Sequence, residues 1–215
     1  MYKYGVRSDG HPAVIPRPRG LTTDLQARVF DAAMATFAEH GFDQSKMEQV
    51  AETAGVARAT LYYHFRTKGD LFRFVLRYGL DLHASFIRER VARARTASDR
   101  LEALIDAYVD FYSQYSSFTH VAIAETARLR PTDDSAPMGM LGPLVEVTAE
   151  TLAEARQAGL LREVDPDICL SAFLGLVSSV PVFYAATNRR LPRTAMKRSL
   201  KTIFLTGVLA APERV

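Results

Sequence analysis

Side chains that can hydrogen-bond to nucleic acid are concentrated in the stretch ARATLYYHF, from Ala57 to Phe65. An arginine in such a stretch can pair with guanine through two hydrogen bonds, and a threonine can bond to a base edge or contact a thymine methyl group. Tyrosine and histidine can donate to phosphate oxygens, which fixes register rather than sequence. In a helix, Leu61 and Phe65 would share one face, with Ala59 and Tyr63 on the opposite side. The pattern predicts a short helix that is anchored by its apolar face and presents its polar face to DNA.

The residues on either side predict the elements that position this helix. A preceding short helix is expected to begin at Ser45, with Glu48 completing a capping box, and to stop at Gly55. Two short helices around such a turn have the proportions of a helix-turn-helix, in which the second helix lies in the major groove. A longer helix is expected to begin beside Lys68. Backbone N–H groups at Ser45 and Lys68 would then point toward solvent or phosphate.

Apolar residues recur every three or four positions along most of the chain, and no long stretch alternates with a period of two. We therefore predict an all-α fold of about nine helices. The first is expected over about Thr23–Glu39, with Thr23 and Gln26 as its capping box and Gly41 as its terminator. Beyond the first four, helices are expected over about residues 98–115, in THVAIAETARL, over about 141–158, from Asp165-Pro166 through a charge-free run, and from Pro192.

The composition is that of a globular protein, with 48% hydrophobic and 24% charged residues in a chain of 215. A single cysteine cannot form an intrachain disulfide, which suits a reducing cytoplasm, and we expect that location. The formal net charge of +3 is accounted for by residues 1–20, which hold four basic side chains and one acidic side chain. A nucleic-acid partner therefore has to be argued from local residues and not from bulk charge.

Two segments leave alternatives open. Residues 1–20 have no apolar region typical of a signal peptide and are expected to form a flexible basic tail, although Arg17 and Arg19 could instead reach a minor groove. Residues 168–188 carry no charge over a length close to that of a transmembrane helix, about 20 residues. The serines and the proline in this run favour a helix that is buried against its own domain and a partner chain. A membrane-anchored DNA-binding protein is the alternative.

The segment KMEQVAETAGVARATLYYHFRTKGDLF resembles the DNA-binding domain of the TetR/AcrR family of bacterial transcriptional repressors, and the match extends over about residues 23–80. The aromatic pair, the His-Phe and the following lysine go beyond a generic helix-turn-helix. The resemblance implies DNA contacts by Arg58, Ala59, Thr60 and Tyr63 at the groove, by Ser45, Tyr62, His64 and Lys68 mostly at the DNA backbone, and by Lys46.

Ala57 departs from the family, which usually has serine or threonine as the cap of the recognition helix. Alanine cannot accept the capping hydrogen bond, so a loss of about 1 kcal/mol of local helix stability is expected, and this end of the helix is expected to fray without DNA. Other roles are open for single residues. Tyr62 could pack against the first helix, His64 could be structural, and Arg58 and Lys68 could be solvated charges.

The later part of the chain resembles, more loosely, the effector-binding and dimerisation domain of AcrR-like members, in VAIAETARLRP, LAEARQAGLLREVDPDICLSAFLGLV and the closing helix. The resemblance implies a homodimer built through the last two long helices and an effector pocket in each subunit. Wide apolar surfaces on these two helices independently favour a dimer. Phe86, Tyr108, Tyr112 and Phe173 are candidates for lining the pocket, with plain core packing as the alternative, and their rings suggest an apolar or aromatic effector.

These observations predict a tail over residues 1–20, a helix-turn-helix domain over 21–66 and an effector-binding and dimerisation domain over 67–215. The expected function is that of a transcriptional repressor, which a small effector releases from a near-palindromic double-stranded DNA operator. A ligand-binding protein with a vestigial DNA head is a further alternative. The sequence shows no catalytic motif and no metal-ligand spacing, so neither an enzyme nor a bound metal or cofactor is expected.

Overall fold

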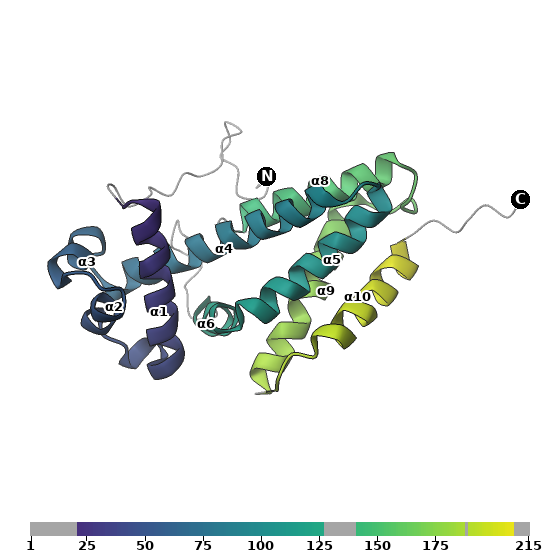
Figure 1. The fold of residues 1–215 in the computed structure, drawn as a ribbon. Coiled ribbons are helices and arrows are strands. Elements are labelled where there is room, and N and C mark those ends of the chain that lie inside the picture. The colour runs from purple at the N-terminus through teal and green to yellow at the C-terminus, as the bar shows by residue number, and fades with distance from the viewer. Residues whose placement is uncertain (1–20, 127–140, 188, 209–215) are drawn as a thin grey trace, which may run out of the picture. The chain divides into compact units, whose positions relative to one another are not determined.

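The structure is a computed structural model, and it describes residues 21–126, 141–187 and 189–208. Within these ranges the regular secondary structure is helical, which confirms the predicted all-α fold (Figure 1). The helices described are α1 (Thr23–Gln44), α2 (Met47–Thr53), α3 (Arg58–His64), α4 (Lys68–Arg93), α5 (Ala97–Gln114), α6 (Ser116–Thr126), α8 (Gly142–Gln157), α9 (Pro166–Ala186) and α10 (Arg193–Val208). The predicted basic tail, with Arg17 and Arg19, and the segment RPTDDSAPMG lie outside the described residues.

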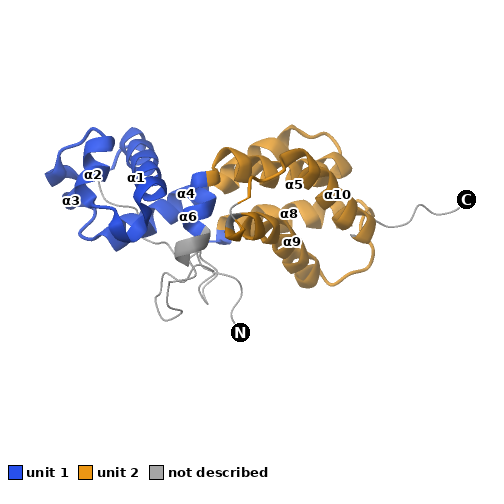
Figure 2. Cartoon of the chain, turned by 90° about the horizontal axis from the view of Figure 1, so that it is seen from below, with its two compact units in different colours: residues 1–81, 117–142 blue, residues 82–116, 143–215 orange. Residues whose placement is uncertain are grey.

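The chain divides into two compact units, which Figure 2 shows in blue and orange. Unit 1 comprises residues 1–81 and 117–142, and unit 2 comprises residues 82–116 and 143–215. The division therefore falls inside α4 and assigns most of α6 to unit 1, whereas the sequence suggested one boundary between residues 66 and 67.

Aromatic packing attaches α6 to unit 1. The ring of Phe118 on α6 is buried, and its centroid lies 5.8 Å from that of Phe30 on α1. At Gly79 on α4, a Cβ atom would lie 2.2 Å from the Phe118 ring. Only glycine allows this approach, because any side chain at position 79 would displace the ring. Nothing in the sequence indicated this contact.

The core of unit 1 forms between α1 and α4. Phe37 of α1 and Phe72 of α4 are both buried, with ring centroids 6.2 Å apart. The N-cap of α1 is Thr22, whose hydroxyl accepts a backbone hydrogen bond of 3.3 Å, and the prediction of Thr23 as the cap was wrong. Gly41 has a φ of 75° and interrupts α1 where a terminator was predicted, but a short helical segment follows it as far as Gln44.

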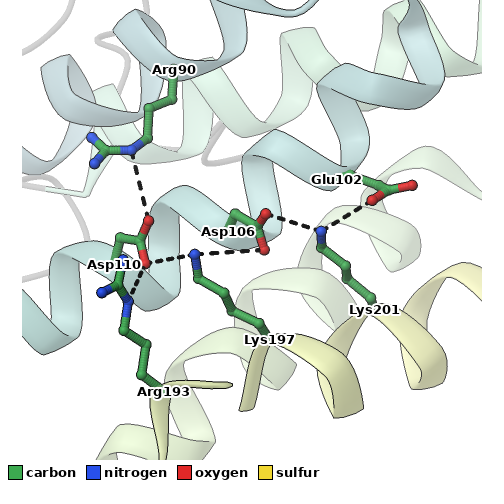
Figure 3. A network of polar contacts seen from close by, with 7 residues as sticks. All are labelled: Arg90, Glu102, Asp106, Asp110, Arg193, Lys197 and Lys201. Atoms are coloured by element: carbon green, nitrogen blue, oxygen red, sulfur yellow. Dashed lines mark hydrogen bonds and ion pairs between the residues drawn. The ribbon is translucent and has the colours of Figure 1, made fainter. Parts of the chain in front are cut away.

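In unit 2, α5 and α10 are joined by a set of opposite charges that we call the charge ladder (Figure 3). Carboxylates on α5 and cations on α10 each recur every four residues, so they line facing sides of two antiparallel helices. Lys201 contacts Glu102 and Asp106 at 3.0 Å each, Lys197 contacts Asp110 at 2.7 Å and Asp106 at 3.9 Å, Arg193 contacts Asp110 at 2.7 Å, and Arg90 of α4 lies 3.9 Å from Asp110.

Asp110 is the most enclosed carboxylate of the charge ladder. Its side chain is 11% exposed, and Arg90, Arg193 and Lys197 contact it. Burial alone would raise the pKa of Asp110, but the hydrogen bonds from Arg193 and Lys197 outweigh that effect, so the pKa is lowered. The carboxylate therefore stays ionised at neutral pH and ties α10 to α5.

The helix α9, which contains most of the charge-free run, is capped as the sequence predicted. Oδ1 of Asp165 accepts hydrogen bonds from the N–H groups of Asp167 and Ile168, at 3.0 Å each. The stretch Pro166–Tyr184 is long and apolar enough to cross a membrane, and 28% of it is buried. A core helix of a soluble protein also meets these criteria, so they do not by themselves indicate a membrane span. Apolar side chains are nevertheless exposed on α9 and α10: Ile168, Val182, Phe183 and Ile203.

Candidate DNA-binding site

Two short helices meet at a tight turn, which confirms the predicted helix-turn-helix. After α2, Gly55 has a φ of 64°, and the N–H of Val56 donates to the carbonyl of Ala51 at 2.9 Å. The start of α2 differs from the prediction, because its first helical residue is Met47 and its N-cap is Lys46. The N–H of Lys46 donates to the Gln49 side chain at 2.8 Å. Gln49, and not Glu48, is therefore the side chain that closes this end of the helix.

Ser45 caps the end of α1 and does not begin α2. Its N–H donates to the carbonyl of Gly41 at 3.2 Å, and its hydroxyl contacts the same carbonyl at 2.6 Å and that of Thr36 at 3.2 Å. The residue is 4% exposed. To contact a phosphate, the Ser45 hydroxyl would therefore have to give up its hydrogen bonds to carbonyl groups of its own chain.

The two faces of α3 differ as the spacing of its residues predicted. Leu61 is 1% exposed and Phe65, which follows the helix, is 2% exposed, so the apolar face is buried in unit 1. Tyr62 is 43% and Tyr63 is 80% exposed, and Arg58 and Ala59 are also exposed. Thr60 and His64 are half-buried. An exposed face with these residue types suits base edges and phosphates and is unlike a protein core.

Glu48 of α2 contacts two side chains of the exposed face of α3. Its Oε1 atom lies 2.6 Å from the Nη2 atom of Arg58 and accepts a hydrogen bond from the hydroxyl of Tyr62 at 3.1 Å. A backbone hydrogen bond, and then the bonds from Arg58 and Tyr62, lower the pKa of Glu48. Tyr62 therefore has a partner on α2, where the sequence had left packing against the first helix open. The sequence did not single out Glu48 for this role.

No side chain caps α3 at Ala57, as the residue type predicted. The extended conformation of Ala57 is that of an N-cap, with a ψ of 142°, but the methyl side chain cannot accept a hydrogen bond. The neighbouring helix α4 has a side-chain cap, since the hydroxyl of Thr67 accepts from the N–H of Asp70 at 3.1 Å and the carboxylate of Asp70 accepts from the N–H of Thr67 at 2.9 Å. The start of α3 is thus less supported than the start of α4.

The ammonium group of Lys68 is bound within the chain. It donates to the carbonyls of Phe42, Asp43 and Ser45 at 2.6, 2.8 and 3.0 Å. It also lies 4.7 Å from the centroid of the Phe42 ring. An ammonium has three donors, and all three are used here. The side chain of Lys68 therefore closes the turn between α1 and α2, and the expectation of a solvated or phosphate-binding ammonium does not match this arrangement.

Arg28 of α1 holds the turn of the motif, which the sequence did not indicate. Its guanidinium donates twice to the carbonyl of Ala54, at 3.2 and 2.6 Å, and once to that of Gly55, at 3.0 Å. It also lies 3.6 Å from Asp24. An arginine next to an aspartate on a helix suggests a surface ion pair, so the sequence offers no signal for the contact with the turn. The contact ties α1 to the turn between α2 and α3.

Unit 2 contains the residues that were predicted to line an effector pocket. Tyr108 and Phe173 are fully buried, with ring centroids 5.5 Å apart. Thr148 donates its hydroxyl proton to the carbonyl of Leu144, so Tyr108 is the donor in its 2.8 Å contact with Thr148. Phe86 and Tyr112 are half-buried, and burial raises the pKa of the Tyr112 hydroxyl.

His83 belongs to the same aromatic cluster, although it was not among the residues predicted to line the pocket. Its ring stacks on Phe111 with centroids 3.8 Å apart, and it meets Tyr108 and Tyr112 edge to face at 4.9 and 5.3 Å. Burial lowers the pKa of His83 to about 3, so the ring is neutral. Its Nε2 atom has no hydrogen-bond partner in the part of the chain that the structure describes.

A cavity of about 320 Å³ lies between the end of α8 and the start of α9 in unit 2. Its wall is mostly apolar and includes Leu152, Leu161 and Leu170, and Arg156 and Arg162 add positive charge. Among the described residues, no group of His, Cys, Asp and Glu side chains could hold a metal ion.

Comparison with known proteins assigns the chain to a family. Residues 29–75 match the model of bacterial regulatory proteins of the tetR family, and residues 94–208 match the model of the tetracyclin repressor-like C-terminal domain. The second match alone spans more than half of the chain.

Individual relatives have the same fold at low identity. The chain is 21% identical to the fatty acid metabolism regulator protein of Bacillus subtilis, over 84% of this chain and 94% of the relative. The crystal structure of the regulator FadR from Bacillus subtilis in complex with stearoyl-CoA has a TM-score of 0.72 at 19% identity, covering 84% of this chain and 98% of that one. AibR in complex with isovaleryl coenzyme A and operator DNA has a TM-score of 0.63 at 22% identity, covering 84% and 98%. The chain therefore belongs to the TetR family of bacterial regulatory proteins and is a DNA-binding transcriptional regulator.

Proposed function

We propose that the protein is a cytoplasmic repressor that an acyl-coenzyme A, or a related acyl compound, releases from its operator. One relative is a fatty acid metabolism regulator, and similar folds bind stearoyl-CoA or isovaleryl coenzyme A. The single observation that carries the DNA-binding part is the exposed polar face of α3 above buried Leu61 and Phe65. This function is compatible with the absence of a catalytic motif in the sequence.

The contacts to DNA follow from this face. Arg58, Ala59, Thr60 and Tyr63 would face the major groove, with Tyr62, His64 and Lys46 at phosphates. The roles of Ser45 and Lys68 are different in this proposal, because both side chains bind carbonyl groups of their own chain. They would position the motif, and the N–H of Ser45, which donates to the carbonyl of Gly41, would reach DNA only if the α1–α2 turn opened.

The proposed dimer forms through α9 and α10, and it places two copies of α3 in successive major grooves of a near-palindromic operator. Support comes from the exposed apolar side chains of these helices, among them Phe183 at 54% and Ile203 at 58% exposure. Apart from neighbouring residues of α9 itself, no described residue has an atom within 4 Å of a Cβ atom built at Gly175, which leaves room for a second helix. Ser178 and Ser179 are exposed beside it.

The proposed effector site is the aromatic cluster of unit 2, where Phe86 and Tyr112 are partly accessible. The ring of Tyr112 lies 6.1 Å from that of buried Tyr108, which packs against Phe173 in the core. The cavity between α8 and α9 is the second candidate, because its apolar wall and Arg156 suit an acyl chain with an anionic end. Tyr112→Leu should weaken the response to effector if the first site is right. Ala153→Phe, which would fill the cavity, should do so if the second is right.

The test of the function is a binding titration with a duplex that the protein selects from a random library. Stearoyl-CoA and isovaleryl-CoA are added to the complex, with free coenzyme A and free stearate as controls. The proposal predicts that an acyl-CoA weakens operator binding by about 100-fold, which corresponds to about 2.7 kcal/mol of coupling. Selection of no duplex would contradict the DNA-binding function, and an operator complex that is insensitive to all these compounds would contradict the effector class.

A further inference from the structure

A carboxylate lies directly against two side chains that are expected to contact DNA. Glu48 belongs to α2, whereas its partners Arg58 and Tyr62 belong to α3. The contacts of 2.6 and 3.1 Å converge on one oxygen of Glu48. A negative charge at this place is unexpected on a DNA-binding surface, because phosphates would repel it.

We infer that Glu48 is a positioning residue for Arg58 that increases the sequence specificity of DNA binding. Its carboxylate balances the charge of the guanidinium and restricts its orientation. Arg58 is thereby available to a base edge that matches its donors and is less attracted to any phosphate. The inference rests on the proposed DNA contact by Arg58 and adds a determinant of specificity to it.

The geometry leaves Arg58 able to read a base. A guanidinium has five N–H donors, and guanine takes two of them through O6 and N7. The nearest contact joins one terminal nitrogen of Arg58 to Glu48 at 2.6 Å, and a single hydrogen bond there uses one of the five donors. Other donors of the guanidinium can therefore form two hydrogen bonds to guanine while the contact between Arg58 and Glu48 is kept.

The same pairing reduces binding to DNA of unrelated sequence. Non-specific affinity depends on the number of phosphates that cations neutralise, and each such contact steepens the dependence of affinity on salt. An arginine whose charge is balanced by a carboxylate contributes little to this term. Because specificity is the ratio of two affinities, a lower non-specific affinity raises it.

Stability is a weak explanation for the contact. The side chain of Arg58 is 68% exposed and that of Glu48 is 34% exposed, and ion pairs at such positions contribute little to folding. Leu61 and Phe65 already anchor α3. The hydrogen bonds that lower the pKa of Glu48 keep it ionised at neutral pH, so its charge is present whenever the protein meets DNA.

The helix α2 offers a matched control. Glu52 lies one turn after Glu48, is exposed, and makes no side-chain hydrogen bond or ion pair with any residue of the described ranges. Glu52→Gln therefore removes the same charge without removing a contact. Glu48→Gln removes the charge and the ion pair but has nearly the same shape as the wild-type side chain. Glu48→Asp keeps the charge, but its shorter side chain places the carboxylate farther from Arg58.

The experiment measures dissociation constants for the duplex selected by the wild-type protein and for a scrambled duplex of equal composition, between about 50 and 200 mM KCl. Glu48→Gln should bind the scrambled duplex roughly tenfold more tightly and change binding of the selected duplex less than about threefold. Its plot of log affinity against log salt should be steeper by about 0.9 for each new phosphate contact. Glu48→Asp should behave in the same direction, and adding Arg58→Ala to Glu48→Gln should remove the gain.

The controls separate three results. Glu52→Gln should change both affinities by the same factor, and unchanged melting temperatures should show that all variants are folded. Equal specificity ratios for Glu48→Gln and Glu52→Gln, or wild-type behaviour of Glu48→Asp, would overturn the inference while leaving the DNA-binding function intact. A wild-type protein that binds the two duplexes equally would instead contradict that function.

Discussion

The ion pairs of the charge ladder and the ion pair of the helix-turn-helix differ in exposure and in number of partners. In unit 2, Asp110 is 11% exposed and Lys197 is 25% exposed, and Asp110 is shared by three cations. In unit 1, Arg58 is 68% exposed and its one ion-pair partner among the described residues is Glu48. Enclosed, shared charges cannot exchange partners without loss of stability, whereas an exposed pair can do so on meeting DNA. The first set is suited to holding helices together and the second to recognition.

The largest effect on this contrast is expected from Asp110→Asn. The change removes the carboxylate from three cations in a partly buried place and should lower the free energy of unfolding by about 2 kcal/mol. Glu102→Gln, on the same helix but with Lys201 as its contact, should cost less than about 1 kcal/mol. Urea denaturation of both variants checks the difference. Equal losses would show that burial and sharing do not set the strength of the charge ladder.

The charge ladder also predicts a dependence of stability on pH. Because the pKa of Asp110 is lowered in the folded state, its contribution is fully present above the pKa of an unfolded aspartate, about 3.9. This contribution is lost as the pH falls from that value through the folded pKa. Between pH 5 and about 3, the melting temperature of the wild-type protein should therefore fall by more than that of Asp110→Asn. Parallel curves for the two proteins would count against an ionised, hydrogen-bonded Asp110.

The exposed pair should show the opposite behaviour, a large effect on DNA binding and none on folding. Arg58→Ala is expected to cost about 1–3 kcal/mol of discrimination at one base pair of the operator and to change the free energy of unfolding by less than about 0.5 kcal/mol. Binding to duplexes with single base substitutions measures the first, and urea denaturation measures the second. A loss of stability like that of Asp110→Asn would erase the contrast between the two regions.

Lys68 belongs to the DNA-binding motif, but its ammonium group is bound within the chain, as the cations of the charge ladder are. Lys68→Met removes the cation from three carbonyls and should destabilise unit 1 by about 1–2 kcal/mol. Arg66→Met, at an exposed neighbour whose side chain forms no hydrogen bond or ion pair with a described residue, should leave stability unchanged within about 0.5 kcal/mol. A Lys68→Met protein of normal stability that binds all DNA more weakly would restore the phosphate-binding role.

The smallest effect is expected at the cap of α3. Ala57→Ser supplies the missing acceptor and should stabilise the helix start by about 0.5–1 kcal/mol. In the wild-type protein, amides of residues 57–60 should exchange fast without DNA and slowly with it. The serine variant should already be slow in the free protein. Equal protection in free and bound wild-type protein would mean that the helix is formed without its cap.

Features that depend on neighbouring residues were predictable from the sequence. The helical spacing of Leu61 and Phe65, the left-handed glycine at Gly55 and the missing cap at Ala57 are all properties of one turn of chain. The resemblance to a known family then supplied the function of the exposed face. Ser45 shows the limit of such reasoning, because it is equally suited to begin one helix and to close the one before it.

Features that depend on distant residues were not predictable. Lys68 meets carbonyls 23 to 26 residues away, and Arg28 meets the turn 26 and 27 residues away. Such contacts arise only when the packing of the helices has fixed the positions of both partners. The contact between Glu48 and Arg58 is of the same kind, since a glutamate in a short helix suggests only capping or solubility. Two of the residues predicted to line the effector pocket, Tyr108 and Phe173, are 2% and 0% exposed and belong to the core.

We propose that α3 presents a surface that reads DNA sequence. The most direct measurement is a competition assay in which the wild-type protein chooses between the selected duplex and a scrambled duplex at about 150 mM salt. We expect a preference of about 10³ or more for the selected duplex, reduced strongly by Arg58→Ala. Equal binding of the two duplexes by the wild-type protein, or a preference that Arg58→Ala leaves unchanged, would contradict it.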